Sequence, residues 1–410
     1  MTAENRRKIR QSFRFSHVKI NRSFKSHGKK TKGGVFVGAI KTTLPGKDTL
    51  AYRFLELTAI CGEFPADLLP RFPGSASYQE TVISSLKKSR LLKTYYRDRL
   101  RGYRLGTRAK ALLLESNPER FSFYLTGNAE TNLLKSEVTR RLRLHRIAEI
   151  YVCMMNAGVS VFRDEKPDVF APDPQSLSPS REAAFYNSRE IKEVGIEAVK
   201  IRGSRMMGAL LAPTGIFLTY NVGSQLHKWE YRAEYRAKVL LQIILCQQRM
   251  VSQYAGCSAC GLLYGDNLDP FYQIFASADS GTRCFFLLDG NYDHFYYFTN
   301  DHYGEVLTKL LCDPDRTSAL NGVLSQGLYA KDPGQPFEHD ALDEQGNPVL
   351  FGYFLDIPRI QRFFTALNLQ DRPGTLICFD FQEEMLRRLC NENIHLQTIS
   401  FEKFERRFYP

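Results

Sequence analysis

Apolar and polar positions between residues 48 and 128 predict four helices and one hairpin. Apolar side chains recur there at the three- and four-residue spacing of a buried helix face, and two short runs read as strands. Ser75 or Ser77 can cap the third helix, Thr107 can cap the fourth, and Gly62 ends the first. The predicted helices cover residues 52–60, 65–70, 75–90 and 107–114, and the predicted strands cover 91–97 and 102–105.

Short strands alternate with helices from residue 183 onward, which is typical of an α/β domain. A hairpin is expected around Ala212-Pro213-Thr214, and the overall fold class is therefore α/β. Further helices are predicted over 130–160, 229–249, 304–311, 358–367 and 382–390, and further strands over 283–288, 294–298, 349–355, 376–381 and 395–399.

Length and composition divide the chain into four parts. A chain of 410 residues is long enough for two or three domains, and its 43% of hydrophobic residues is ample for packed cores. The N-terminal segment mixes Ser, Gly, Lys and Arg with few apolar side chains, so it cannot bury enough surface to fold and is expected to be disordered. We therefore expect a basic arm over 1–47, a helical domain over 48–128, a basic linker helix over 129–160 and an α/β domain over 161–410.

The net charge of +12 is unevenly distributed along the chain. Residues 1–47 hold 13 Lys or Arg against one acid, and residues 48–150 hold 18 basic against 11 acidic residues. Residues 151–410 reverse this balance, with 25 basic against 32 acidic residues. A like-charged block attracts a polyanion, because neutralising phosphates releases counterions. We therefore expect nucleic acid to contact the first 150 residues and the α/β domain to face away from it.

The sequence predicts neither a membrane span nor a secretory signal. No uninterrupted apolar run reaches the ~18 residues that a membrane helix needs, and the basic N-terminus lacks a following apolar stretch. Its arginine-rich, acid-poor start is also compatible with a transit peptide. Nine cysteines at irregular spacings argue against a disulfide framework, so we expect a reducing, cytoplasmic location and no membrane partner.

Residues 75–114 resemble the recognition helix and wing of a winged helix-turn-helix DNA-binding domain. The helix has small polar residues early and cations late, which suits a major groove, and Gln79 is the candidate for a base contact. Arg90 stands where many winged domains have Gly, so the turn there must tolerate a side chain. The residues expected to contact DNA are Ser75, Ser77, Gln79, Thr81, Ser84, Lys87 and Lys88 on the helix and Arg97, Arg99, Arg101 and Arg104 on the wing.

The order of parts is similar to that of the replication-relaxation family of plasmid and conjugative-element proteins. The winged helix is followed by Arg143-x-His145-Arg146-x-Ala148-Glu149-Ile150 and then by an α/β domain. This resemblance implies a double-stranded DNA-binding accessory or regulatory protein of a bacterial mobile element, associated with the nucleoid or a plasmid. It implies replication or transfer proteins as partners, no cofactor, and a restriction-endonuclease-like α/β domain that serves dimerisation or partner contacts.

Two other functions stay open. Asp168, Glu190 and Lys192 match the Asp…Glu-x-Lys pattern of metal-dependent nucleases, in which two carboxylates hold a divalent metal and the Lys stabilises the scissile phosphate. Residues 185–188 would then have to form a strand, whereas the simpler interpretation is a loop Asp and a solvated helix face. The second alternative is a protein–protein adaptor whose basic arm binds acidic partners.

Cys257 and Cys260 have the spacing of metal or redox ligands. A structural zinc site needs two more ligands, and the nearby sequence offers only Cys246 and His227. Because no second Cys-x-x-Cys pair occurs, the sequence predicts no metal site there.

Overall fold

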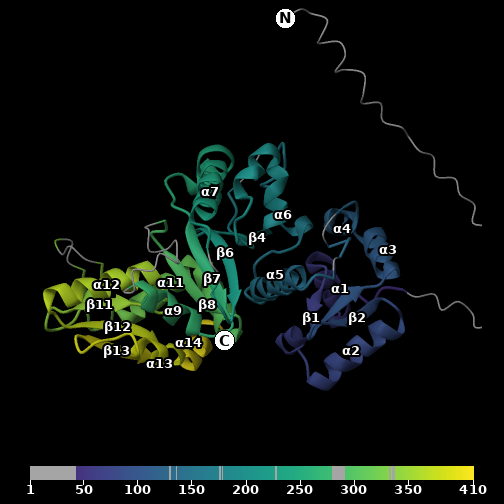
Figure 1. Ribbon diagram of the computed structural model, residues 1–410. Coiled ribbons are helices and arrows are strands. Elements are labelled where there is room, and N and C mark those ends of the chain that lie inside the picture. Colours follow the sequence, from purple (N-terminus) through teal and green to yellow (C-terminus); the bar gives the residue numbers. More distant parts are fainter. Residues whose placement is uncertain are drawn as a thin grey trace, which may run out of the picture. The chain divides into compact units, whose positions relative to one another are not determined.

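The computed structural model describes residues 43–128, 131–134, 136–174, 177, 179–226, 229–278, 291–331, 334 and 338–410. The basic arm predicted over 1–47 lies outside the described residues as far as Thr42, and the strand predicted over 283–288 also lies outside them. Residues Thr43–Pro410 form one compact unit that combines helices with three sheets, which confirms the α/β class (Figure 1). No helix in the described ranges is both long and apolar enough to cross a membrane.

The first sheet belongs to the N-terminal elements and is antiparallel, with strand order β1-β3-β2. The predicted helices and hairpin are confirmed with ends shifted by a few residues. Thr107 does not cap its helix, however, because it is the first helical residue and Gly106 precedes it without a side-chain bond. The elements are α1 (Leu50–Cys61), β1 (Phe64–Pro65), the 3-10 helix η2 (Ala66–Arg71), α2 (Ala76–Lys88), β2 (Leu92–Arg97), β3 (Leu100–Leu105), α3 (Thr107–Ser116) and α4 (Pro118–Leu125).

The second sheet has the order β4-β5-β6-β7-β8, antiparallel from β4 to β6 and parallel from β6 to β8. The predicted hairpin around Pro213 is confirmed as β5–β6, and the long helix predicted over 229–249 is confirmed as α7 continued by the π-helical segment η5. The strands are β4 (Ala184–Asn187), β5 (Gly208–Ala212), β6 (Gly215–Gly223), β7 (Cys260–Gly265) and β8 (Phe295–Thr299). The helices are η3 (Arg163–Glu165), α6 (Ser188–Ile191), η4 (Lys192–Ile201), α7 (Tyr231–Gln242), η5 (Ile243–Arg249), α8 (Val251–Tyr254) and α9 (Asp269–Ala278).

The third sheet has the order β13-β12-β11-β10-β9, so the predicted α/β region contains two separate five-stranded sheets. Its three longest strands are parallel, and helices connect them. The strands are β9 (Tyr329–Ala330), β10 (Ala341–Leu342), β11 (Pro348–Phe351), β12 (Gly374–Phe379) and β13 (Ile394–Ile399). The helices are α10 (His302–Leu311), α11 (Pro314–Leu324), α12 (Ile357–Gln370), η7 (Asp380–Gln382), α13 (Glu383–Arg387) and α14 (Phe401–Phe408).

Helix α5 (Val138–Asn156) is the predicted basic helix, and it lies between the N-terminal elements and the second sheet (Figure 1). It packs against α1, α10 and β6. Five consecutive residues from Ile150 to Met154 are buried, which means that neighbours surround the C-terminal half of the helix on every side. Its N-terminal half is more polar, yet Arg141 and His145 are buried there as well. Helix α5 is therefore a packed element that joins two parts of one core.

Candidate nucleic-acid interface

Helix α2 presents a polar face to solvent. It begins after Ser75, whose hydroxyl accepts a hydrogen bond from the Tyr78 N–H at 3.3 Å. Ile83 and Leu86 are buried and fix the inward face of the helix. The predicted outward positions that are exposed are Ser75, Ser77, Thr81, Ser84, Lys87 and Lys88.

Gln79 does not point outward, contrary to the sequence-based expectation. Only 4% of this residue is exposed. Its side-chain amide donates to the Phe72 carbonyl at 2.8 Å and to the Gly74 carbonyl at 3.3 Å, in the turn before α2. Gln79 therefore satisfies buried backbone acceptors of that turn and is not positioned to contact a base.

The turn after α2 accommodates the side chain of Arg90, as the sequence requires. Arg90 has φ 59°, and the Leu91 N–H donates to the Leu86 carbonyl at 3.0 Å, which closes the helix with a Schellman motif. A Cβ at Gly106 would lie 2.2 Å from the Arg90 carbonyl oxygen. The turn therefore accepts a side chain at 90 but requires glycine at 106. Arg90 is exposed and adds a cation beside α2.

The β2–β3 hairpin exposes three arginines around its turn. Asp98 and Arg99 have φ 53° and 62°, which is the geometry of the two-residue turn that matches the twist of a hairpin. Arg97, Arg99 and Arg101 are exposed. Arg97 pairs with Asp98 at 3.3 Å, a contact at the surface that is weak in water. These three arginines are therefore accessible to an anionic partner.

Arg104, the fourth predicted hairpin contact, is not accessible in the same way. Its Nε donates to Glu63 Oε2 at 2.8 Å and its Nη2 donates to the same oxygen at 2.6 Å. The guanidinium also stacks 3.7 Å from the centre of the Tyr95 ring. Arg104 is thus a structural partner of a buried carboxylate, contrary to the expectation of an outward DNA contact.

Glu63 is a fully buried carboxylate that three cationic or ionisable side chains surround. Arg141 Nη2 donates to its Oε1 at 2.6 Å, and the His145 Nε2 lies 2.9 Å from the same oxygen. Burial raises the pKa of Glu63, but the hydrogen bonds from His145, Arg141 and Arg104 outweigh burial and lower this pKa to about 2. Glu63 is therefore ionised at neutral pH, and its charge is matched inside the protein.

Arg141 also fixes the hairpin to α5. Its Nη1 donates to the Arg97 carbonyl at 2.7 Å and its Nη2 donates to the Leu100 carbonyl at 2.9 Å, which are the residues that flank the turn. A Cβ at Gly102 would lie 2.4 Å from Glu63 Oε1, so only glycine leaves room for the carboxylate. No sequence pattern signals the pairing of Glu63 with Arg141, because the two residues are 78 positions apart.

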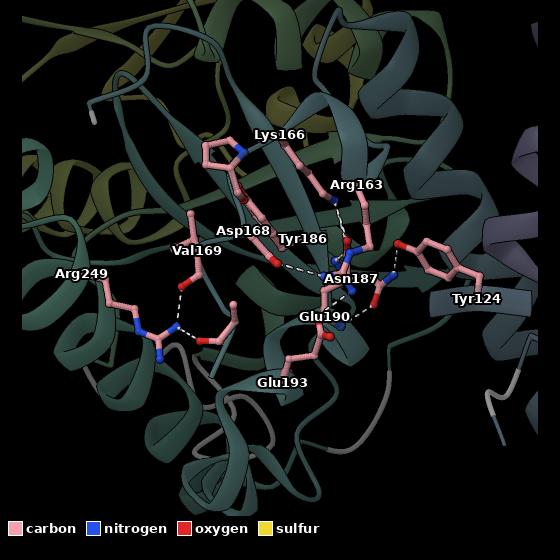
Figure 2. A network of polar contacts seen from close by, with 12 residues as sticks. Tyr124, Arg163, Lys166, Asp168, Val169, Tyr186, Asn187, Glu190, Glu193 and Arg249 are labelled. Carbon is pink, nitrogen blue, oxygen red and sulfur yellow. Dashed lines mark hydrogen bonds and ion pairs between the residues drawn. The ribbon is translucent and has the colours of Figure 1, made fainter. Parts of the chain in front are cut away.

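The structure places Glu190 of the nuclease alternative at the buried start of a helix and Asp168 on an exposed loop. Glu190 is buried in a capping box of α6, where its carboxylate accepts from the Asn187 N–H at 2.8 Å and pairs with Lys166 at 2.9 Å (Figure 2). Asp168 is 62% exposed on a loop and pairs with Arg163 at 3.1 Å. The two carboxylates are thus engaged by different cations.

The Glu-x-Lys spacing also falls on the wrong kind of element. The strand β4 that the alternative requires is present, but it ends at Asn187, and Glu190 follows on a helix. Residues two apart share a face of a strand but diverge on a helix, and accordingly Glu190 is buried while Lys192 is exposed. The pattern Asn187-x-x-Glu190 is itself a capping-box signal that reveals this structural role from sequence.

In the described part of the chain, Cys257 and Cys260 do not belong to an assembled metal site. Cys257 and Cys260 are free thiols, and the Cys246 thiol donates to the Cys257 carbonyl at 3.5 Å. Burial raises the pKa of the Cys260 thiol to about 12, which disfavours the thiolate that a metal or redox site needs. His227, the fourth ligand considered, lies outside the described residues. Within the described ranges, no group of three or more His, Cys, Asp or Glu side chains is placed to hold a metal.

No protein-family model, no curated protein and no solved structure matches this chain. Inference of its function therefore depends on its own surface chemistry. That surface combines the hydroxyls and lysines of α2 with the three exposed arginines of the β2–β3 hairpin, supported from beneath by Glu63 and Arg141.

Replacing Arg141 tests the buried support. Arg141→Met leaves the Glu63 charge short of donors, so we expect the free energy of unfolding to fall by about 3–5 kcal/mol. The control Arg140→Met removes an exposed arginine that pairs with Glu137 at 2.9 Å, and should cost less than about 1 kcal/mol. Urea denaturation followed by circular dichroism measures both, and equal losses would contradict a structural role for Arg141.

The acid stability of the protein tests the ionised state of Glu63. Its pKa falls from an ordinary value of 4.5 to about 2 on folding, so its contribution is complete above pH 4.5 and disappears as the pH falls towards 2. This contribution amounts to about 3 kcal/mol. Glu63→Gln should be less stable at neutral pH and should lose less stability over that acid range. Parallel slopes for both proteins in urea titrations between pH 5 and 2.5 would show that Glu63 is not the titrating group.

Proposed function

We propose that this chain is a double-stranded DNA-binding accessory or regulatory protein of a mobile genetic element, and that residues 48–128 are its winged helix-turn-helix domain. The observation that carries this proposal is the exposed trio Arg97, Arg99 and Arg101 on a hairpin that buried ionic contacts fix in place. The element order α1-β1-η2-α2-β2-β3 supports it, because α2 comes directly before the hairpin. The sheet order β1-β3-β2 supports it as well, because β1 pairs with the hairpin strand β3. In this proposal α2 is the recognition helix and the hairpin is the wing.

The two elements have different roles in the proposed complex. Helix α2 offers hydroxyl groups to base edges, and a hydroxyl can pair with either a donor or an acceptor, so it discriminates bases weakly. The burial of Gln79 removes the strongest candidate for a base-specific contact. Lys87, Lys88 and the wing arginines face phosphates, which supply affinity without sequence information. Most of the proposed binding energy is therefore electrostatic.

The assignment to a mobile element rests on the resemblance to the replication-relaxation family. In that assignment the chain acts in plasmid replication or conjugative transfer, with replication or transfer proteins as partners. The α/β region then serves dimerisation or partner contacts. The engagement of Glu190 by Lys166 and of Asp168 by Arg163 supports a non-catalytic role over the nuclease alternative.

Substituting the wing arginines tests the proposed DNA contact. Arg99→Ala with Arg101→Ala should weaken binding to any duplex and reduce the slope of log affinity against log salt by about 2, because two phosphates are no longer neutralised. The matched control is Arg387→Ala with Arg406→Ala, which removes two exposed arginines from α13 and α14. Fluorescence anisotropy with a labelled duplex at several salt concentrations measures affinity and slope.

The outcomes separate the alternatives. Unchanged affinity and slope in the wing variant would overturn the wing assignment. Equal weakening in the control variant would show that only net charge matters. Binding that persists at high salt, without preference for DNA over an acidic protein, would favour the adaptor alternative.

A further inference from the structure

Two cavities meet on the side of α5 opposite the hairpin support. One has a volume of about 310 Å³, and the other has a volume of about 450 Å³. Arg143 and Ser204 line both, so the two cavities are neighbours, and we call them together the arginine cleft. The positively charged residues that line it are Arg143 and Arg146 from α5, Lys192 from η4, and Arg202 and Arg205 from the segment between η4 and β5.

The arginine cleft is uniformly cationic. Five positively charged side chains line it, and no Asp or Glu stands among the lining residues that the structure describes. A concave surface of one charge concentrates its electric field and attracts the opposite ion. Arg143, Arg202 and Arg205 are exposed, so a ligand can reach them. Thr139 and Ser188 also line the cleft, and their hydroxyl groups can hydrogen-bond an oxyanion.

Two acids, Glu234 and Glu149, hydrogen-bond residues that line the cleft without lining it themselves. Glu234 accepts from the Ser204 hydroxyl at 2.6 Å and from the Arg205 N–H at 2.6 Å. Glu149 accepts from the Asn221 side-chain amide at 2.7 Å, and burial raises its pKa to about 7, which reduces its mean negative charge at neutral pH. Burial lowers the pKa of Arg146, and the positive charge of Arg205 lowers it further. The negative charges of Glu149 and Asp266 raise the same pKa and offset part of this decrease. An anion between these arginines would relieve their repulsion.

One face of α5 is specialised for this cleft. Thr139, Leu142, Arg143 and Arg146 line the smaller cavity and follow the helical spacing of three, four and seven residues. Arg141 and His145 lie on the other face and bind Glu63. The cleft arginines are therefore not part of the hairpin support.

We propose that the arginine cleft binds the phosphate groups of a nucleotide, either free or within a single nucleic acid strand. Arginine suits this ligand because its planar guanidinium forms paired hydrogen bonds with phosphate oxygens. The cavity volumes lie in the range of small-ligand sites, and they admit one nucleotide or a strand segment but not a duplex. The inference goes beyond the proposed duplex binding and does not depend on it.

Trp229 lines the smaller cavity and is the single tryptophan of the sequence, so its fluorescence reports on the site. The probes are inorganic pyrophosphate and a single-stranded tetrathymidylate, each titrated by tryptophan fluorescence and by isothermal titration calorimetry. We expect saturable binding of at least one probe. Arg143→Ala with Arg205→Ala should weaken it at least about ten-fold, because each substitution removes charge-assisted hydrogen bonds.

A control variant keeps this test separate from a general loss of positive charge. Arg387→Ala with Arg406→Ala removes equal charge from α13 and α14 and should bind both probes as the unaltered chain does. Tighter binding of the strand assigns the cleft to nucleic acid, and tighter binding of pyrophosphate assigns it to a free nucleotide. Absence of binding to both probes by both methods, or equal affinity in the Arg143/Arg205 variant, would overturn the proposal.

Discussion

The ionised Glu63 carboxylate is the point on which the arrangement of the N-terminal elements depends. A buried charge is costly unless it is paired and hydrogen-bonded, and here Arg141, Arg104 and His145 provide both. These residues come from β3 and α5, so the carboxylate, which directly precedes β1, links that strand, the hairpin and the central helix. The hairpin backbone that carries the exposed arginines is held by hydrogen bonds from Arg141 to the carbonyls of Arg97 and Leu100.

Helix α5 connects this support to the rest of the molecule. One face of the helix binds Glu63 and the carbonyls that flank the hairpin turn, and another face lines the arginine cleft. Its C-terminal half lies within the apolar core. Helix α5 therefore contacts both cationic regions, of which the hairpin exposes its arginines to solvent and the cleft holds them in the walls of cavities.

Much of the fold could be predicted from sequence, because helix and strand periods depend on local pattern. The boundaries of α2 and of the β2–β3 hairpin follow from such patterns, whereas the division of the strands into two five-stranded sheets depends on pairing between distant segments. The site is less predictable. Helical spacing alone places Gln79 on the outward face of α2. Its side chain lies inward because it donates to the carbonyls of Phe72 and Gly74, and these belong to a turn that no helix or strand period predicts. Arg104 resembles the other hairpin arginines in sequence because its partner Glu63 lies 41 positions away.

The support beneath the hairpin also constrains how this protein can change over generations. Replacing any one of Glu63, Arg141 or Arg104 removes an ionic partner from a buried charge, so single substitutions pass through a less stable intermediate. Gly102 belongs to the same group, since a larger residue would collide with the carboxylate. Among related sequences these positions should persist or change together, whereas the fold itself places no such constraint on the exposed arginines beside them. Substitutions at the exposed hairpin positions can therefore change the binding surface while the buried residues that hold the hairpin stay the same.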